Sequence, residues 1–546
     1  MRKKLIALFI LFALCGSVYA QVPYVKKSFF KNFGGLNDQL SATEIEDNEA
    51  SDIQNVVFDT GGVIKKRNGF LTIPTSPLVK VISGNVTAIT GLKFYEQNDG
   101  SKHIVVVANV GGKPYVVKKT YVNDDIPQGL WEDIHNNSIA PQSGYTDNDL
   151  VSFAVAEDLV ILALDNTTQT KPFKWSGTGG LANLTSDGDC PSSTIVLYHK
   201  NHLFLAGDDS NPSRVSFSAL DDIATYVATD FFDVQTADGS KVRGLVSAFN
   251  SLYIFKDESI WRLSGFERDT FVLQKMVSGI GTSSHQSIAV IDDAIFFTTT
   301  QGDIAAYNGG YSVVFVSKKI RETVDGLNFS RANKSLGLAF STYRYNDFDY
   351  YTSVSNGSSA THNRVLLFDL AFESWTKFVG MNINAWDVAD DNDGKKAILF
   401  GDYAGYVHQY PSTKFYDGDV DESAIDAFYQ TKWFRFDDLA LGDKYLRIVK
   451  SQVLSETSLD TFLTLDVRSD FQVSGNSFSI PISSSGSLWG AFTWGEDSWA
   501  GQSLIVDRRE TNKGTDMFQL HYSNNKISES FSLFGFQLYL EPTDRT

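Results

Sequence analysis

Short apolar runs recur along most of the chain, and each is followed by a polar turn and a shorter strand-like segment. From about residue 86 the centres of these runs are HIVVVAN (103–109), LVILALD (159–165), HLFLAGDD (202–209), SLYIFKDESIWRL (251–263), AIFFTTTQGDIAAY (294–307), FDYYTSV (348–354) and AILFGDYAGYVHQY (397–410). The centres advance by about 49 residues, a period typical of four-stranded propeller blades. Few charges interrupt them, as expected for strands buried between blades.

This pattern predicts an all-β fold whose main part, residues 86–412, is a six- or seven-bladed β-propeller. A single blade cannot bury both of its faces, so neighbouring repeats are expected to stack into a ring. The seven centres are compatible with six or seven blades, because strands from both ends of the chain can close the ring. A set of β-sandwiches with similar strand spacing is the alternative.

The pattern changes near residue 413. Residues 413–426 belong to an acidic, turn-rich stretch that we interpret as a linker. DGDVDE (417–422) resembles a calcium loop, but Glu422 stands where an EF-hand requires glycine. Segments such as TFLTLDVRS and FSLFGFQLYLEP then alternate apolar and polar positions, which indicates strands with one buried face. We therefore predict a C-terminal β-sandwich over residues 427–546.

Residues 21–85 are predicted to form an N-terminal arm. Asp47 or Asn48 is expected to cap a short helix that continues through Ile53. The next stretch, VVFDTGGVIKKR, predicts a hairpin in which Gly61 and Gly62 supply the positive φ that a tight turn needs.

Residues 1–20 have a basic start, an apolar run of limited length and the ending Val-Tyr-Ala, which together are typical of a signal peptide. A hydrophobic arm that stays on the protein is the alternative. The run is too short to span a bilayer, and no other segment is long and apolar enough, so we expect no stable membrane insertion.

Net charge and the numbers of cysteine and histidine residues limit the classes of function to consider. The formal net charge is −18, and an acidic surface does not hold nucleic acid, because binding requires cations that displace counterions. Two interpretations of the negative charge are open: it keeps the protein soluble, or it lines a channel surface that DNA passes without binding. Two cysteines, one inside the signal-like segment, and eight scattered histidines predict no disulfide, no zinc site and no cofactor.

Motifs of catalysis are scarce. GIGTSSHQS (279–287) contains serine and histidine, but both lie in one loop, and we interpret it as a turn between blades. A glycosidase site, which needs a pair of carboxylates, is an open alternative, because acidic residues are abundant. We predict that the protein is not an enzyme.

Two groups of residues are candidates for interaction. One is a basic cluster formed by Lys65, Lys66 and Arg67. It could bind an acidic partner or DNA phosphates; the alternative is that it forms the solvated edge of the hairpin. The other is a run of three tryptophans, Trp489, Trp494 and Trp499. The alternatives for their role are stacking on sugars, packing on a partner protein, or covering an open end of the sandwich.

Four stretches, taken in order, resemble a known family. The first, residues 29–70, carries Gly34-Gly35-Leu36-Asn37, Asn48-Glu49-Ala50 with Asn55, and then Asp59, Gly62, Lys66, Arg67 and Gly69. The others are residues 259–290, 400–410 and 523–542. Together they resemble the β-propeller tail proteins of short-tailed bacteriophages, called nozzle or muzzle proteins; the signal-like start resembles exported proteins of Bacteroidetes hosts and suggests a crAss-like phage.

The resemblance implies a structural virion protein of the tail. Several copies, commonly six, would form a ring that extends the DNA channel, retains and conducts the genome, and anchors fibres. The implied partners are the tube or adaptor ring, fibres, and DNA that passes without sequence-specific binding. The signal-like start and the tryptophan run support the alternative, a periplasmic or secreted bacterial propeller that binds glycans or proteins at the cell surface.

Overall fold

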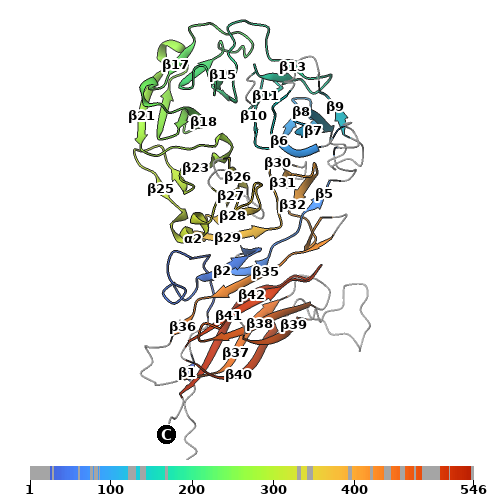
Figure 1. The fold of residues 1–546 in the computed structure, drawn as a ribbon, viewed down its shortest axis with the longest axis vertical. Coiled ribbons are helices and arrows are strands. Elements are labelled where there is room, and N and C mark those ends of the chain that lie inside the picture. The colour runs from blue at the N-terminus through green and yellow to red at the C-terminus, as the bar shows by residue number, and fades with distance from the viewer. Residues whose placement is uncertain are drawn as a thin grey trace, which may run out of the picture.

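The computed structural model describes residues 25–26, 30–59, 62–73, 78, 84, 86–120, 131–135, 143–165, 170–328, 334–340, 349–390, 396–418, 422–435, 444–454, 461–472, 475–482, 505–515 and 517–542. Seven four-stranded antiparallel sheets are arranged in a ring, and two six-stranded sheets form a second body beside it (Figure 1). The signal-like segment 1–20 lies outside the described residues. No helix in the described ranges is long and apolar enough to cross a membrane.

The first four blades follow one another along the chain. Blade 1 contains β6 (Val86–Glu96), β7 (Lys102–Val110), β8 (Pro114–Thr120) and β9 (Glu132–Asp133). Blade 2 contains β10 (Val151–Ala156), β11 (Leu159–Leu164), β12 (Phe173–Trp175) and β13 (Ala182–Asn183). Blade 3 contains β14 (Ile195–His199), β15 (His202–Ala206), β16 (Arg214–Phe217) and β17 (Phe231–Asp233). Blade 4 contains β18 (Val242–Ala248), β19 (Ser251–Lys256), β20 (Ser259–Ser264) and β21 (Val272–Ser278).

The last three blades complete the ring. Blade 5 contains β22 (Ala289–Ile291), β23 (Ala294–Thr298), β24 (Ile304–Tyr307) and β25 (Val314–Phe315). Blade 6 contains β26 (Leu336–Phe340), β27 (Asp349–Val354), β28 (Arg364–Asp369) and β29 (Ser374–Val379). Blade 7 contains β30 (Ala385–Asp390), β31 (Lys396–Gly401), β32 (Val407–Tyr410) and β5 (Leu71–Thr72).

The ring is closed by a strand that precedes blade 1. β5 supplies the fourth strand of blade 7, where Thr72 pairs with His408 and Leu71 with Gln409. The predicted propeller is thus confirmed, with seven blades among the described residues. Each of the seven apolar centres overlaps the second strand of a blade. β7, β15 and β19, for example, bury nearly all of their side chains.

Short helical turns connect some of the blades: η2 (Thr236–Asp238), η4 (His285–Ser287), η5 (Ser317–Ile320) and α2 (Arg321–Asp325). Another, η3 (Arg268–Thr270), lies within blade 4, between β20 and β21. η4 lies between blades 4 and 5, so the loop GIGTSSHQS is a connection between blades, as the sequence predicted.

The sandwich uses strands from both ends of the chain. One sheet contains β1 (Val25–Lys26), β3 (Val56–Asp59), β4 (Val63–Lys66), β37 (Lys444–Leu454), β40 (Ile505–Thr515) and β42 (Ser532–Pro542). The other contains β2 (Ala50–Gln54), β35 (Ala427–Thr431), β36 (Phe434–Arg435), β38 (Thr461–Ser469), β39 (Asn476–Ile482) and β41 (Met517–Asn524). Between propeller and sandwich, β33 (Tyr416–Asp417) pairs with β34 (Ser423–Ala424).

The predicted helix at residues 47–53 is wrong: this stretch contains β2, which pairs with β35. The prediction relied on Asp47 or Asn48 as a helix cap, but both residues lie in a turn that precedes β2. Aspartate and asparagine favour turns as well as helix caps, because their side chains bond to nearby backbone groups in both. The predicted hairpin is present as β3 and β4, and Gly62 in its turn has a φ of 71°.

Candidate functional site

The segment that carries the family resemblance lies where the propeller meets the sandwich. We call this region the joint, defined by residues 34–37, 48–55 and 62–69 together with the propeller and linker residues they contact. Leu36 donates its backbone N–H to the carbonyl of Trp375 on β29 at 2.8 Å. Gly35 lies so close to the same strand that a Cβ would stand 2.7 Å from the Trp375 oxygen. Glycine is therefore required by close backbone approach.

A polar chain, buried at Asn37 and Glu49 and exposed at Lys319, extends the joint toward blade 5. Asn37 donates from Nδ2 to Glu49 Oε2 at 2.7 Å, and Glu49 Oε1 pairs with Lys319 Nζ of η5 at 2.9 Å. Burial acts to raise the pKa of Glu49, but the bonds from Lys319 and Asn37 outweigh it and leave the pKa below its ordinary value. The "GGLN" turn and the "NEA" stretch thus hold each other and one blade in place.

Arg67 is the centre of the joint and is 0% exposed. Its guanidinium makes a bidentate ion pair with Asp417 of β33, at 2.8 and 2.6 Å. The remaining N–H groups bond to Asn55 Oδ1 and to the carbonyls of Asn68 and Val379. All five donors of the side chain are therefore satisfied, and one residue connects the hairpin, the linker and blade 6.

Asn55 lies beside Arg67 and has the left-handed φ of 53° that asparagine tolerates better than most residues. Its Oδ1 also accepts the backbone N–H of Val379 at 2.9 Å, and its Nδ2 donates to the Asp426 carbonyl at 2.9 Å. It therefore contacts both the outermost strand of blade 6 and the segment just before the sandwich strand β35.

Lys66 is also buried, on the sandwich side of the joint. Its Nζ donates to Asn524 Oδ1 at 2.7 Å and to the Lys526 carbonyl at 3.0 Å. Burial lowers the pKa of this lysine to about 8. Lys65 is half-buried and pairs with Asp59 across the hairpin at 2.6 Å. The predicted basic cluster is therefore split among internal partners, and Lys66 and Arg67 are not available to an acidic partner or DNA in this fold.

Lys66 should make stability rise with pH in an alkaline window. Between pH 8 and its ordinary pKa of 10.5, the unfolded chain holds a proton on this residue that the folded chain has lost, so unfolding becomes less favourable as pH increases. Lys66→Met removes this contribution. We expect the difference in unfolding free energy between wild type and this variant to change by up to about 1.4 kcal/mol per pH unit within the window.

Urea unfolding at several pH values between 8 and 10.5 measures this difference. Lys65→Met, in the same hairpin, is the matched control for the substitution itself, because Lys65 is half-buried and paired with Asp59. Parallel stability curves for wild type and Lys66→Met would rule out the titration of Lys66.

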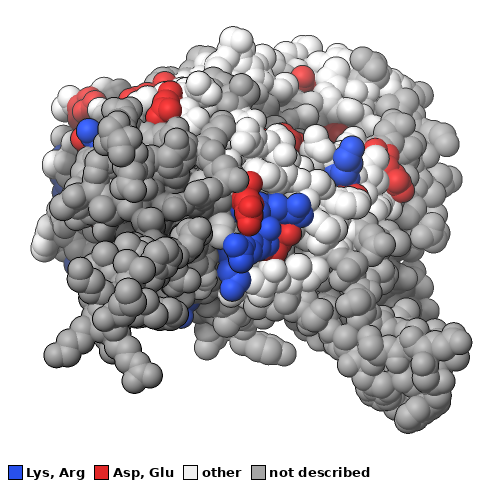
Figure 2. Space-filling view, turned by 90° about the horizontal axis from the view of Figure 1, so that it is seen from below, with Lys and Arg blue, Asp and Glu red and all other residues white. Residues whose placement is uncertain are grey.

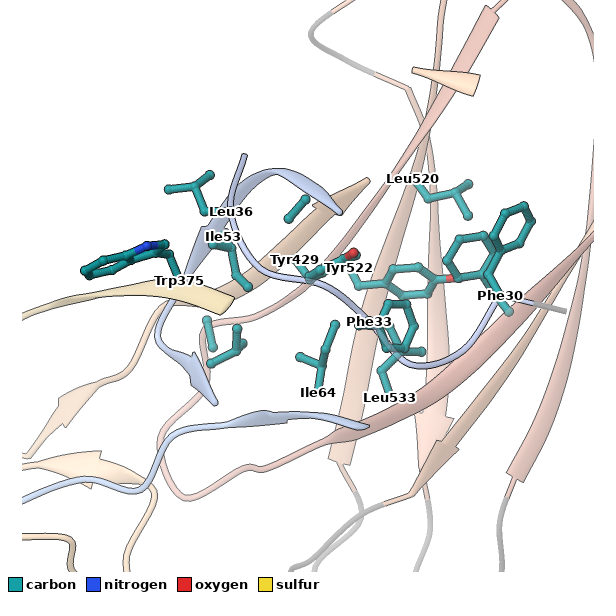
Figure 3. Packing of buried hydrophobic residues seen from close by; sticks show 14 of the residues in the cluster. Phe30, Phe33, Leu36, Ile53, Ile64, Trp375, Tyr429, Leu520, Tyr522 and Leu533 are labelled. Atoms are coloured by element: carbon teal, nitrogen blue, oxygen red, sulfur yellow. The ribbon is translucent and has the colours of Figure 1, made fainter. Parts of the chain in front are cut away.

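Apolar packing joins the two bodies around the same residues. Trp375, 1% exposed, belongs to one continuous cluster with Leu36 and Ile53 of the N-terminal segment and with Tyr429 and Tyr522 of the sandwich. Figure 3 shows the N-terminal segment running between the propeller strand that carries Trp375 and the sandwich strands. Propeller and sandwich therefore share one core at the joint.

The tryptophan candidates Trp489, Trp494 and Trp499 lie outside the described residues. Seen from the sandwich end, basic side chains gather in a compact group that also contains acidic ones (Figure 2). On β40, Arg509 pairs with Asp507 at 2.7 Å and Arg508 with Glu510 at 3.5 Å. Local carboxylates therefore offset part of the positive charge on this strand.

Two hollows of ≈ 200 Å³ each lie along the axial channel of the propeller, among the described residues. Gln286 of η4 lines both, and its Nε2 donates across the channel to the Val151 carbonyl of blade 2 at 3.1 Å. One hollow lies at the mouth and the other among the first strands of blades 1, 2, 6 and 7. Side chains thus obstruct the axis of a single propeller.

Nothing in the described residues forms a group of three or more histidine, cysteine, aspartate or glutamate side chains able to hold a metal ion. Cys190 is buried, and burial raises the pKa of its thiol to about 12, which keeps it protonated.

Comparison with known proteins finds no matching family model and no matching curated protein. Solved structures with similar folds include the Neurospora crassa Pan2 WD40 domain, with 10% identity, 64% of this chain and 96% of that chain covered, and a TM-score of 0.37. YCF48 bound to D1 peptide has 12% identity, 60% and 94% coverage and a TM-score of 0.36. A glycoside hydrolase family 43 arabinoxylan arabinofuranohydrolase from Bacillus subtilis has 12% identity, 86% and 99% coverage and a TM-score of 0.25. At these identities the similarity concerns the fold alone.

Proposed function

We propose that the protein is a structural component of a short-tailed phage tail, a nozzle-type subunit that assembles into a ring, extends the DNA channel and anchors fibres. The observation that supports this most is the joint. The residues that carry the resemblance to nozzle proteins, from Gly35 through Asn55 to Arg67, are the same residues that connect propeller and sandwich. The sequence motifs that resemble nozzle proteins therefore coincide with the contacts between the propeller and the sandwich, which supports a shared arrangement of these two domains.

A tail ring must transmit force between its parts without catalysis, and a shared core suits that role. In this proposal the DNA passage is formed by several subunits around the tail axis, because Gln286 and its neighbours obstruct the axis of each propeller. The acidic balance of the chain, −18 overall, would keep the passing DNA from sticking. The protein would line the DNA passage without binding DNA specifically or modifying it.

Ring formation is the first test of this proposal. Sedimentation and electron microscopy of the purified full chain should show closed rings with one subunit number, expected to be six, and a central opening. A chain that stays monomeric at high concentration and in the presence of its neighbouring tail proteins would contradict the proposed assembly.

The signal-like residues 1–20 favour a second candidate, a secreted propeller that binds glycans or proteins at the bacterial surface. Fractionation of the native host distinguishes the two, because this candidate requires the mature chain in the periplasm or medium of cells that release no phage. Binding to a glycan array by that fraction would support it further.

A further inference from the structure

The mouth of the propeller channel forms a hollow of ≈ 200 Å³ lined mainly by polar and charged side chains. Its walls come from the loops that precede the first strands of blades 2 to 6 and from the turns after β11 and β15. An engineered cavity of about 150 Å³ takes up benzene. This hollow therefore has room for one extended side chain but not for a folded segment.

The floor of the mouth offers a hydrogen-bond acceptor. Gln286 uses its Nε2 to donate to the Val151 carbonyl at 3.1 Å, which fixes the amide across the channel. Its Oε1 is left as an acceptor for a donor that enters the mouth. The apolar residues Ile195 and Val242 also line the hollow, so a ligand with an aliphatic stem and a donor-rich end matches both features.

Carboxylates outnumber available cations at the mouth. Each cation that lines it is held by an aspartate, namely Lys334 by Asp165 at 2.5 Å, Lys241 by Asp209 at 3.0 Å and Arg243 by Asp257 at 2.8 Å. Asp208 also lines the mouth, and it accepts bonds from the Ser210 backbone N–H and from Asn211 Nδ2. Among the described residues, no lysine or arginine lies within ion-pair distance of Asp149, whose Oδ2 accepts the Thr146 backbone N–H at 2.7 Å.

The surroundings only partly stabilise the charge of Asp149. Burial raises the pKa of Asp149 and the nearby charge of Asp165 adds to this, whereas hydrogen bonds from Thr146 and the charge of Lys334 oppose it without outweighing it. His285 also lines the mouth, but burial lowers its pKa to about 4, so it is neutral near pH 7. Its Nδ1 accepts the Leu245 backbone N–H at 3.5 Å. The mouth therefore has one carboxylate, Asp149, without an ion-pair partner among the described residues, and it lies with the Lys334-bound Asp165 and the Gln286 amide oxygen in the same hollow.

We propose that the propeller mouth binds a lysine or arginine side chain presented by a partner protein, with Asp149, Asp165 and Gln286 receiving its cationic end. Charge-assisted bonds to carboxylates are the strong ones in proteins, and they suit a cation entering a partly buried site. The acidic chain as a whole would also draw a basic partner segment toward it.

Histidine-ring NMR on the isolated full chain tests this proposal, since His285 is one of only eight histidines and lines the site. The probes are four capped pentapeptides of glycine and serine with a central arginine, lysine, glutamate or glutamine. The arginine and lysine peptides should shift the His285 signal saturably, and the glutamate and glutamine peptides should not. Asp149→Asn should weaken binding at least tenfold.

Asp292→Asn is the matched control, because Asp292 is exposed in the turn between β22 and β23, at the other end of β22 from the mouth. It should bind like the wild type. Asp165→Asn gives a second variant, and the other histidine signals report whether each variant is folded. A response to the glutamate peptide equal to that of the arginine peptide would overturn the proposal. So would no saturable shift with any peptide, or unchanged arginine-peptide binding in folded Asp149→Asn and Asp165→Asn. None of these results depends on ring formation.

Discussion

Arg67→Ala is expected to destabilise the folded chain by about 3–5 kcal/mol, the range found when one partner of a buried ion pair is removed. Asp417 is itself 7% exposed, so the substitution leaves a carboxylate buried without its bidentate partner. It also leaves the Val379 carbonyl and Asn55 Oδ1 without the bonds that they receive from Arg67. Urea unfolding followed by tryptophan fluorescence measures the loss as a shift of the midpoint.

Two further variants sharpen this test. Lys65→Ala, two residues away, breaks the half-exposed pair with Asp59, and such a pair is worth no more than about 1 kcal/mol. Arg67→Lys keeps the charge but loses the planar fork, so it should fall between wild type and alanine. An Arg67→Ala midpoint equal to that of Lys65→Ala would show that the joint does not depend on the Arg67–Asp417 pair.

Gly35→Ala is expected to produce the other large effect, a loss of about 1–3 kcal/mol or more from overpacking. The added Cβ would meet the backbone of Trp375 and, at 2.9 Å, the Cβ of Ser374. The strand β29 cannot retreat easily, because Trp375 is buried and its Nε1 donates to the Val316 carbonyl at 2.9 Å. Thermal unfolding of the purified variant should therefore show a lower midpoint, with reduced soluble yield.

Gly188→Ala is the matched control for this substitution. A Cβ at Gly188 meets nothing within 4 Å, so the same chemical change should leave the midpoint within the error of wild type. If Gly35→Ala is as stable as Gly188→Ala, the close approach between the N-terminal segment and blade 6 does not exist in solution.

The propeller could be predicted from the sequence because its strongest signal is local. The second strand of each blade is buried on both faces, so runs such as IVVVA in β7 stand out without knowledge of their partners. The strands of the sandwich were similarly visible, since β38 alternates buried and more exposed positions along its length. Both signals lie within a few consecutive residues.

The joint could not be predicted, because its contacts are distant in sequence. Arg67 and Asp417 are separated by 350 positions, and nothing near Asp417 distinguishes it from the other acidic residues of the linker. In the sequence, a cluster of basic residues in an acidic chain suggests a surface that binds partners. In the structure, Lys66 and Arg67 of this cluster are buried and bond to other parts of the same chain. The closing strand β5 is only two residues long, too short for a periodic pattern.

Mass spectrometry of purified phage particles from a host that produces this chain tests the proposed function most directly. We predict peptides of this protein in fixed proportion to other tail proteins. We also expect the N-terminal peptide to reveal whether residues before Gln21 remain in the particle. Absence of the chain from particles, together with its recovery from the periplasm or medium, would contradict a role in the phage tail.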